Sequence, residues 1–130
     1  MYSEYTFVFD IDGTLCPIKT KDERYEDIVP YPDMLEKLRY YKDNGARIIL
    51  LTSRNMNTYK GDIGSINKYT ARVLLDWLDK WQIPYDGIIY GKVWPGHKGF
   101  YVDDRTVRPD EFLKYSPEEL EGICAQSRQH

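Results

Sequence analysis

The sequence predicts an α/β fold in which helices cover both faces of a mainly parallel sheet. Two observations support this prediction. Short apolar runs alternate with longer stretches in which apolar residues recur at helical spacing. Clusters of polar residues follow the apolar runs directly, as expected where parallel strands end at the functional edge of an open sheet. The predicted order is strand, helix, strand, helix, strand, loop, strand and helix, which is typical of α/β proteins.

Four continuous apolar runs are the predicted strands. Runs of this kind, in which apolar residues do not alternate with polar ones, are typical of parallel strands buried on both faces. The runs comprise residues 7–9 (FVF), 46–51 (ARIILL), 87–90 (GIIY) and 100–102 (FYV). We therefore expect four strands in one sheet.

Three helices are predicted from periodicity and from capping signals. The first begins at Pro32 and is stopped by Gly45. The second covers about residues 67–81, where apolar side chains recur at helical spacing. The third begins at the capping box of residues 116–119 and runs to about Ser127. Two other stretches show no clear period, and we interpret residues 16–31 as a flap and residues 55–67 as a functional or mobile loop.

Composition limits the class of protein. With 130 residues we expect a single domain, residues 1–130, and the hydrophobic share of 42% with a charged share of 30% is ordinary for a globular protein. A net charge of −3 without a basic block argues against a nucleic-acid partner. No apolar run is long enough for a membrane span, and no signal segment is evident. Two cysteines, Cys16 and Cys124, read as reduced packing thiols of a cytoplasmic protein.

Polar clusters at the ends of the predicted strands form one candidate site. They contain Asp10 and Asp12, then Thr52, Ser53 and Arg54, then Lys92, and finally Asp103 and Asp104. Two nearby acids repel each other unless a cation or a shared proton holds them, and Mg2+ is the obvious cation for oxygen ligands. Taken alone, Asp10 and Asp12 also fit a strand end and a capped turn. The whole set, however, suits a phosphate held by a metal and a lysine, with one carboxylate free to attack phosphorus.

These motifs resemble those of the haloacid dehalogenase (HAD) superfamily of phosphatases and phosphotransferases. The resemblance rests on Asp-x-Asp-Gly-Thr at 10–14, on Thr52, on Lys92 and on the acid pair at 103–104, in the expected order. Further stretches, at 53–56, 91–92, 96–97 and 100–105, are similar to a small capless branch often described as capsular polysaccharide biosynthesis proteins. The resemblance implies a Rossmann-like three-layer sandwich with a HAD core and no cap.

The resemblance also implies a role for each motif residue. Asp10 would be the nucleophile, and Asp12 would be the general acid for the leaving oxygen and then the base that activates water. Thr52 would hydrogen-bond the phosphoryl group, with backbone N–H groups near Ile11 and Ser53 completing the cradle. The Asp10 carboxylate, the Asp12 backbone carbonyl and one acid of the 103–104 pair would bind Mg2+. We favour Asp104 as the direct ligand and Asp103 as its support.

Other candidates depend on position. Lys92 follows the third predicted strand at the functional edge, whereas Lys98 precedes the fourth strand and should lie at the opposite edge, so we select Lys92. Arg54 fits two roles equally, a clamp for an anionic part of the substrate or a partner for a nearby acid. Asn57, in the long loop, is a candidate for shaping the pocket, and a solvated loop is the alternative.

The predicted function is Mg2+-dependent hydrolysis of a small-molecule phosphate monoester through an aspartyl-phosphate. A phosphorylated sugar or another capsule polysaccharide precursor is the expected substrate, in a cytoplasmic enzyme. Since no segment is large enough for a cap, we expect an open site that suits large substrates or enclosure by a neighbouring subunit in a homo-oligomer. Two alternatives remain: a nucleotidase or nucleic-acid 3′-phosphatase, and a non-catalytic binding module on the same fold.

Overall fold

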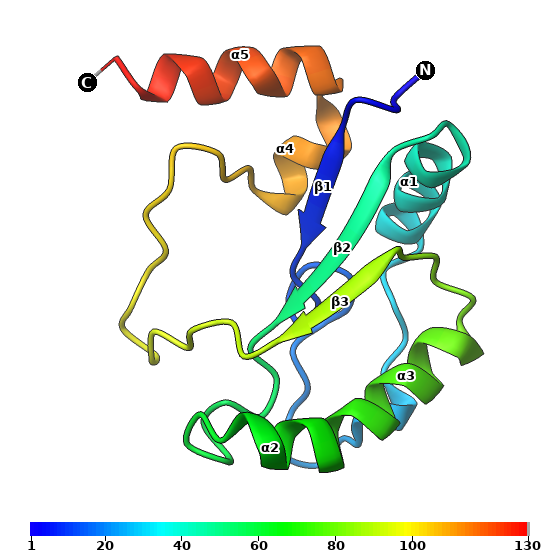
Figure 1. Cartoon of the computed structure of the whole chain (residues 1–130), viewed down its shortest axis with the longest axis vertical. Coiled ribbons are helices and arrows are strands. Elements are labelled where there is room, and N and C mark those ends of the chain that lie inside the picture. The colour runs from blue at the N-terminus through cyan, green and yellow to red at the C-terminus, as the bar shows by residue number, and fades with distance from the viewer. Residues whose placement is uncertain (130) are drawn as a thin grey trace. The chain divides into compact units, whose positions relative to one another are not determined.

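The computed structural model describes residues 1–129, which form two compact units (Figure 1). The first unit comprises residues 1–94 and contains the sheet, and the second begins at Pro95 and contains two helices. Among residues 1–129, no helix is both long enough and apolar enough to cross a membrane. That residues 1–130 act as a single domain stays a prediction.

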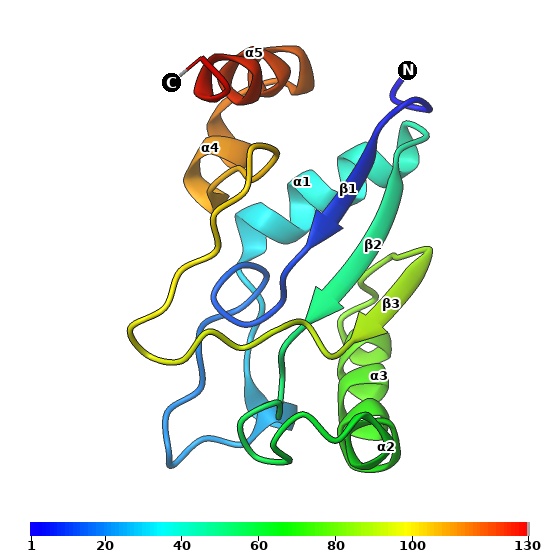
Figure 2. The same ribbon diagram turned by 60° about the vertical axis from the view of Figure 1, so that its left-hand side comes forward.

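Three parallel strands form the sheet of the first unit, with β2 in the middle. They are β1 (Thr6–Phe9), β2 (Arg47–Thr52) and β3 (Gly87–Tyr90). The register pairs Phe9 with Leu50 and Leu50 with Ile88. All three strands therefore run the same way and end at one edge, as the arrowheads in Figure 2 show. The α/β class and three of the four predicted strands are confirmed.

The first predicted helix is α1 (Pro32–Asp43), and its boundaries follow from local signals. Pro32 occupies the first helical position, where its missing N–H costs no hydrogen bond. At the other end, the backbone N–H of Asn44 donates to the Tyr40 carbonyl at 3.1 Å. Gly45 then takes a φ of +99°, a left-handed conformation that glycine adopts without a steric cost.

The second predicted helix begins earlier than expected. It consists of α2 (Ile63–Ser65), a π-helical turn (Ile66–Thr70) and α3 (Ala71–Lys80). The Asp62 side chain caps this segment, because its Oδ1 accepts from the Gly64 N–H at 3.1 Å. The loop predicted for residues 55–67 is therefore helical over its last five residues.

The core of the first unit lies between the sheet and the helices. Its buried members include side chains of β2, α1 and α3: Ile48, Leu50, Leu38, Leu74 and Trp77. The Trp77 indole N–H also donates to the Ile28 carbonyl at 2.7 Å, which ties the flap to α3. The flap itself contains a short 3₁₀ helix (Tyr25–Asp27), so residues 16–31 are not an unstructured loop.

The second unit contains α4 (Pro109–Lys114) and α5 (Pro117–Ser127). The predicted capping box is confirmed, because the Glu119 N–H donates to Ser116 Oγ at 3.2 Å and the Ser116 N–H donates to Glu119 Oε1 at 3.1 Å. Helix α4 was not predicted from the sequence. Its signals are Pro109 at the first position and a buried Phe112, which are too few to define a period.

The fourth predicted strand is wrong. Residues 100–102 form no strand, and Phe100 and Val102 expose 86% and 97% of their surface. A run of three apolar residues forms a strand only where a neighbouring strand supplies backbone hydrogen bonds, and the described residues of the second unit contain no strand. Asp103 and Asp104 therefore follow an extended loop and not a strand end.

Candidate functional site

The candidate site lies at the edge of the first unit where the three strands end. Asp10 directly follows β1, Thr52 is the last residue of β2, and Lys92 is the second residue after β3. The Lys92 backbone N–H donates to the Thr52 carbonyl at 3.0 Å, which holds the chain after β3 beside the end of β2. The topology thus brings together residues that are up to 82 positions apart in the sequence.

Two side chains contact the Asp10 carboxylate. Thr14 donates its hydroxyl to Asp10 Oδ2 at 3.1 Å, and the Lys92 ammonium lies 3.6 Å from Asp10 Oδ1. The Asp10 side chain remains 30% exposed. Desolvation by burial raises the pKa of Asp10 above its ordinary value, and it outweighs the opposite effect of Lys92 and the Thr14 hydrogen bond. Asp10 is an accessible carboxylate whose negative charge is only partly compensated.

A tight turn after β1 presents the two acids. The Ile11 carbonyl accepts from the Thr14 N–H at 3.1 Å and from the Leu15 N–H at 2.8 Å. The Ile11 side chain is completely buried, so it anchors the turn between the acids. Gly13 has a φ of +90°, which side-chain-bearing residues rarely adopt. Thr14 was not predicted as a site residue, although its place in the motif could have indicated it.

Asp12 is bound by a different cation. Arg54 donates from Nε to Asp12 Oδ2 at 3.0 Å and from Nη2 to Asp12 Oδ1 at 2.8 Å. The Arg54 side chain is 1% exposed and that of Asp12 is 23% exposed. The Tyr25 ring covers the guanidinium, with its centroid 4.1 Å from Arg54 Cζ. Of the two roles open for Arg54, the structure therefore contains the pairing with a nearby acid.

Thr52, Ser53 and Asn57 lie along the chain that follows β2. Thr52 is buried, and its Oγ1 accepts from the Arg54 N–H at 3.0 Å, which turns the chain toward Asp12. Ser53 is half-buried at the same turn, whereas Asn57 is exposed in the loop. A neighbour, Asn55, anchors this loop: its Oδ1 accepts from the Thr70 hydroxyl at 2.6 Å.

The buried Cys16 thiol adjoins this site without contributing a nucleophile. Its Sγ lies 3.7 Å from Asp12 Oδ1 as a weak donor. Desolvation, followed by the negative charge of Asp12, raises the pKa of Cys16 to about 12. The thiolate is therefore scarce at neutral pH, consistent with the prediction of a packing thiol.

Asp103 and Asp104 make their contacts within the second unit. Asp103 Oδ1 accepts from the Arg105 N–H at 2.8 Å, and Asp104 Oδ2 pairs with Arg128 Nε at 2.5 Å. The hydrogen bond from Arg128 holds the pKa of Asp104 below its ordinary value. Whether this pair serves the same site as Asp10 stays a prediction.

The metal prediction rests on the two acids of the first unit. Within residues 1–129, no group of three or more His, Cys, Asp or Glu side chains is arranged to hold a metal ion. Mg2+ nevertheless often binds through one or two carboxylates, substrate phosphate and water. The accessible, partly uncompensated carboxylate of Asp10 fits that mode of binding, since a nearby cation would favour its ionised form.

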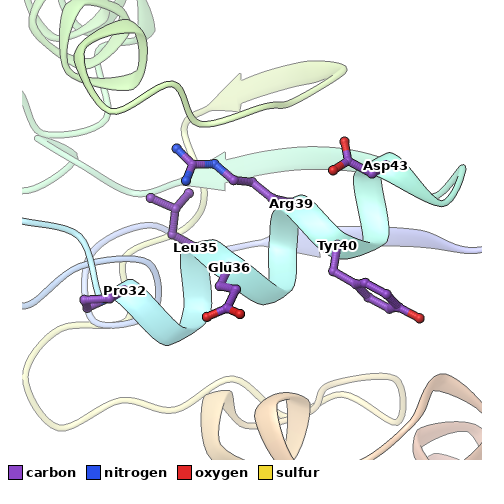
Figure 3. Close-up of a pocket in the computed structure, with 6 residues that line it drawn as sticks. All are labelled: Pro32, Leu35, Glu36, Arg39, Tyr40 and Asp43. Atoms are coloured by element: carbon purple, nitrogen blue, oxygen red, sulfur yellow. The ribbon is translucent and has the colours of Figure 1, made fainter.

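A separate cavity of about 570 Å³ lies along α1 (Figure 3). It is lined by Pro32, Leu35, Glu36, Arg39, Tyr40 and Asp43. Arg39 is engaged structurally, because its Nη2 donates to the Trp81 carbonyl at 2.7 Å and so ties α1 to the end of α3. The cavity shares no residue with the site around Asp10 and Asp12.

Comparison with known proteins identifies relatives by structure. The crystal structure of an MCSG target from Vibrio cholerae is 44% identical in sequence, with a TM-score of 0.88, over 95% of this chain and 98% of that one. Two structures of a Pnkp1/Rnl/Hen1 complex, one of them described as an RNA repair complex, match at 20% and 22% identity. They cover 72% and 85% of this chain but 27% and 33% of theirs, and their TM-scores of 0.48 are too low to support an argument.

No family model and no curated protein matches the chain. The likeness to the Vibrio cholerae protein, by contrast, extends over nearly all of both chains at an identity well above the level that chance produces. The chain belongs to the same protein family as that Vibrio cholerae protein.

Proposed function

We propose that this member of the family is a HAD-type phosphatase: a Mg2+-dependent phosphate monoester hydrolase that acts through an aspartyl-phosphate on Asp10. The main support is the meeting of Asp10, Asp12, Thr52 and Lys92 at one edge of a parallel sheet, from segments far apart in the sequence. A structural role alone gives no reason to keep an accessible carboxylate beside a lysine at the end of a parallel strand. Under this proposal, the whole chain forms a capless HAD core.

Asp10 is the nucleophile in this proposal. One of its carboxylate oxygens attacks phosphorus, and the bond between phosphorus and the ester oxygen breaks. Lys92, 3.6 Å from Asp10 Oδ1, lies where it can neutralise charge on the phosphoryl oxygens. Thr14 holds the other carboxylate oxygen through its hydroxyl, so that one oxygen is oriented and the other is available for attack.

Asp12 transfers protons in both halves of the reaction. In the first half it gives a proton to the leaving ester oxygen, which departs as an alcohol. In the second half it removes a proton from a water molecule that attacks the aspartyl-phosphate. Inorganic phosphate leaves, and the Asp10 carboxylate is restored. Asp12 is 23% exposed, so its carboxylate is reachable by substrate and water.

Mg2+ would be held by the Asp10 carboxylate and the Asp12 backbone carbonyl; that one acid of the 103–104 pair also binds it stays a prediction. When bound, it neutralises charge on the phosphoryl group. The substrate we propose is a phosphorylated sugar or another capsule polysaccharide precursor, bound between the flap and the loop of residues 55–67. A net charge of −3 disfavours a polynucleotide substrate.

The test is phosphate release from an aryl phosphate, from a panel of sugar phosphates and from nucleotides, with and without Mg2+. The Asp10→Asn variant should abolish metal-dependent turnover, whereas the control variant Asp76→Asn, which changes an exposed acid on α3, should retain it. The ranking of the panel then distinguishes sugar from nucleotide substrates. Turnover on none of these compounds, or full turnover by Asp10→Asn, would contradict the proposal and favour a binding module.

A further inference from the structure

The Arg54 guanidinium is enclosed in a way that excludes direct contact with a substrate. Its side chain is 1% exposed, and two of its three nitrogens donate to the two oxygens of Asp12. The third nitrogen, Nη1, is buried and has no hydrogen-bond partner among the described residues. A clamp for a substrate anion must present donors at an accessible surface, and Arg54 presents none.

The pairing of Arg54 with Asp12 determines the orientation of a carboxylate. Two parallel N–H to oxygen bonds fix both the position and the plane of the acceptor group, whereas a single ammonium fixes neither. The Arg54 backbone is held in turn, since its N–H donates to the buried Thr52 Oγ1 at 3.0 Å. A chain of hydrogen bonds therefore runs from the end of β2 through Arg54 to Asp12.

Tyr25 brings the flap into this arrangement. Its ring lies over the guanidinium at 4.1 Å, on the 3₁₀ helix of the flap. The residue that follows this helix, Ile28, is held by the hydrogen bond from the Trp77 indole N–H to its carbonyl. The guanidinium donates its hydrogen bonds within its own plane, whereas the Tyr25 ring contacts its face and so restricts movement out of that plane.

We propose that Arg54 is the positioning residue for Asp12 and that Tyr25 completes the arrangement by holding Arg54 in place. This inference rests on the proposed function, in which Asp12 transfers the protons. Arg54 would then act on the chemical step through Asp12 and not on substrate binding. A buried ion pair is in itself a weak source of stability, because the cost of removing both charges from water offsets their attraction. A positioning role gives a reason for its presence.

The first test separates positioning from substrate binding by steady-state kinetics on an aryl phosphate with Mg2+. Arg54→Ala should lower kcat by about 10²-fold with little change in KM, since misplacement of a catalytic group by about 1 Å costs that much. Added guanidinium should restore part of kcat, whereas ammonium should not. Arg54→Lys should stay impaired because one ammonium cannot make the double bond to Asp12. Arg24→Ala, which removes an exposed arginine from the flap, is the control and should behave as wild type.

Other kinetic outcomes would overturn the inference. A raised KM with unchanged kcat would mean that Arg54 binds the substrate. Unchanged values of both would mean that the ion pair is structural only. For the flap, Tyr25→Phe should retain kcat because it retains the ring, and Tyr25→Leu should lower kcat by about two- to fivefold. Equal kcat values for the two Tyr25 variants would remove Tyr25 from the proposal.

The second test does not depend on turnover. The thermal midpoints of Asp12→Asn, Arg54→Gln and the double variant form a cycle. Asp12→Asn leaves the buried guanidinium of Arg54 without its charged partner, and Arg54→Gln leaves the half-buried carboxylate of Asp12 without one. The double variant should therefore lose clearly less than the sum of the two single losses. Additive losses would show that Arg54 does not hold Asp12. If the wild type lacks turnover while the cycle shows coupling, the proposed function fails but the pairing of Arg54 with Asp12 stands. If the wild type is active and the Arg54 variants have normal kinetics, only the positioning role is contradicted.

Discussion

Asp10 and Asp12 are separated by one residue, yet their surroundings differ in kind. Asp10 faces a lysine at 3.6 Å and a threonine hydroxyl, and it retains the larger exposed fraction, 30% against 23%. Asp12 is bound at both oxygens by a buried arginine at 3.0 and 2.8 Å. A loosely paired carboxylate can move toward an electrophile, whereas a doubly bound one is fixed. The comparison teaches that two acids one residue apart can be held in different ways by the cations that reach them, and this difference supports the separate tasks proposed for them.

The cations differ because they come from different strands. Lys92 follows β3 and reaches Asp10 with a flexible side chain, while Arg54 follows β2 and lies beneath the flap. A lysine brings a mobile point charge, which suits a phosphoryl group that arrives and leaves. An arginine brings a planar fork, which suits a carboxylate that must keep its orientation.

The largest expected effect distinguishes the tasks of the two acids. With an aryl phosphate, whose leaving oxygen needs little help from an acid, Asp12→Asn should still transfer phosphate to Asp10 but should hydrolyse it about 10²- to 10⁴-fold more slowly. Asp10→Asn should not become phosphorylated at all. Intact-mass measurement after rapid acid quenching would detect the added phosphoryl group. Labelling of Asp10→Asn, or rapid hydrolysis by Asp12→Asn, would remove the proposed distinction.

The next effect concerns the lysine. Lys92→Ala should lower kcat/KM by about 10²- to 10³-fold, because it removes a cation at the site where charge develops. Both kcat and KM should change, in contrast to the kcat effect expected for Arg54. The matched control is Lys98→Ala, which removes the other candidate lysine and should leave kinetics unchanged. Equal effects of the two substitutions would contradict the choice of Lys92.

A smaller effect, on stability, concerns Ile11, which lies between the acids and is completely buried. Ile11→Ala should lower the free energy of unfolding by about 2–5 kcal/mol, and Ile11→Val by about 0.5–1.5 kcal/mol. Urea denaturation followed by circular dichroism would measure both. Since Ile11 anchors the turn that presents both acids, the rate at which Asp10 becomes phosphorylated and the rate at which the aspartyl-phosphate is hydrolysed should both fall per folded molecule. If Ile11→Ala lowers the free energy of unfolding by less than the value expected for Ile11→Val, the turn is held by its hydrogen bonds alone.

The smallest effect comes from an exposed acid–cation pair used as a reference. Asp86 accepts from Lys42 Nζ at 2.7 Å and from the Ile48 N–H at 2.8 Å, and these contacts hold its pKa below the ordinary value. Folding favours the ionised form of Asp86. Its contribution to the stability of the folded protein is therefore fully present above pH 3.8, the ordinary pKa, and is lost as the pH falls through the lower pKa of the folded state. Asp86→Asn should therefore lower the thermal midpoint by a few degrees at most at pH 7 and by less at pH 2. An equal loss at both pH values would contradict this linkage.

Much of the architecture could be predicted because its signals are local. Pro32 and Gly45 mark the ends of α1, and Ser116 with Glu119 marks the start of α5. These residues act on hydrogen bonds a few positions away, so neighbouring sequence is sufficient to read them. The signals failed for residues 100–102, where three apolar residues resemble a strand but form none, and the described residues of the second unit contain no strand that could pair with them.

The candidate site was predicted in part for the same reason. Asp10, Asp12, Thr52 and Lys92 stand at the ends of apolar runs, and parallel pairing brings such ends to one edge whatever the details. Thr14 and Tyr25 were missed, Tyr25 because an aromatic residue in a charged, aperiodic flap gives no signal of its contacts.

The sequence by itself determined the α/β class, the three paired strands and the meeting of four polar residues at the ends of the strands: Asp10, Asp12, Thr52 and Lys92. Periodicity and strand direction follow from the order of residues, which is why these features could be predicted. Only the tertiary structure decided which cation binds which acid. That choice depends on distances between side chains 42 positions apart, on the burial of Arg54 and on the fold of the flap over it. Packing in three dimensions sets all three.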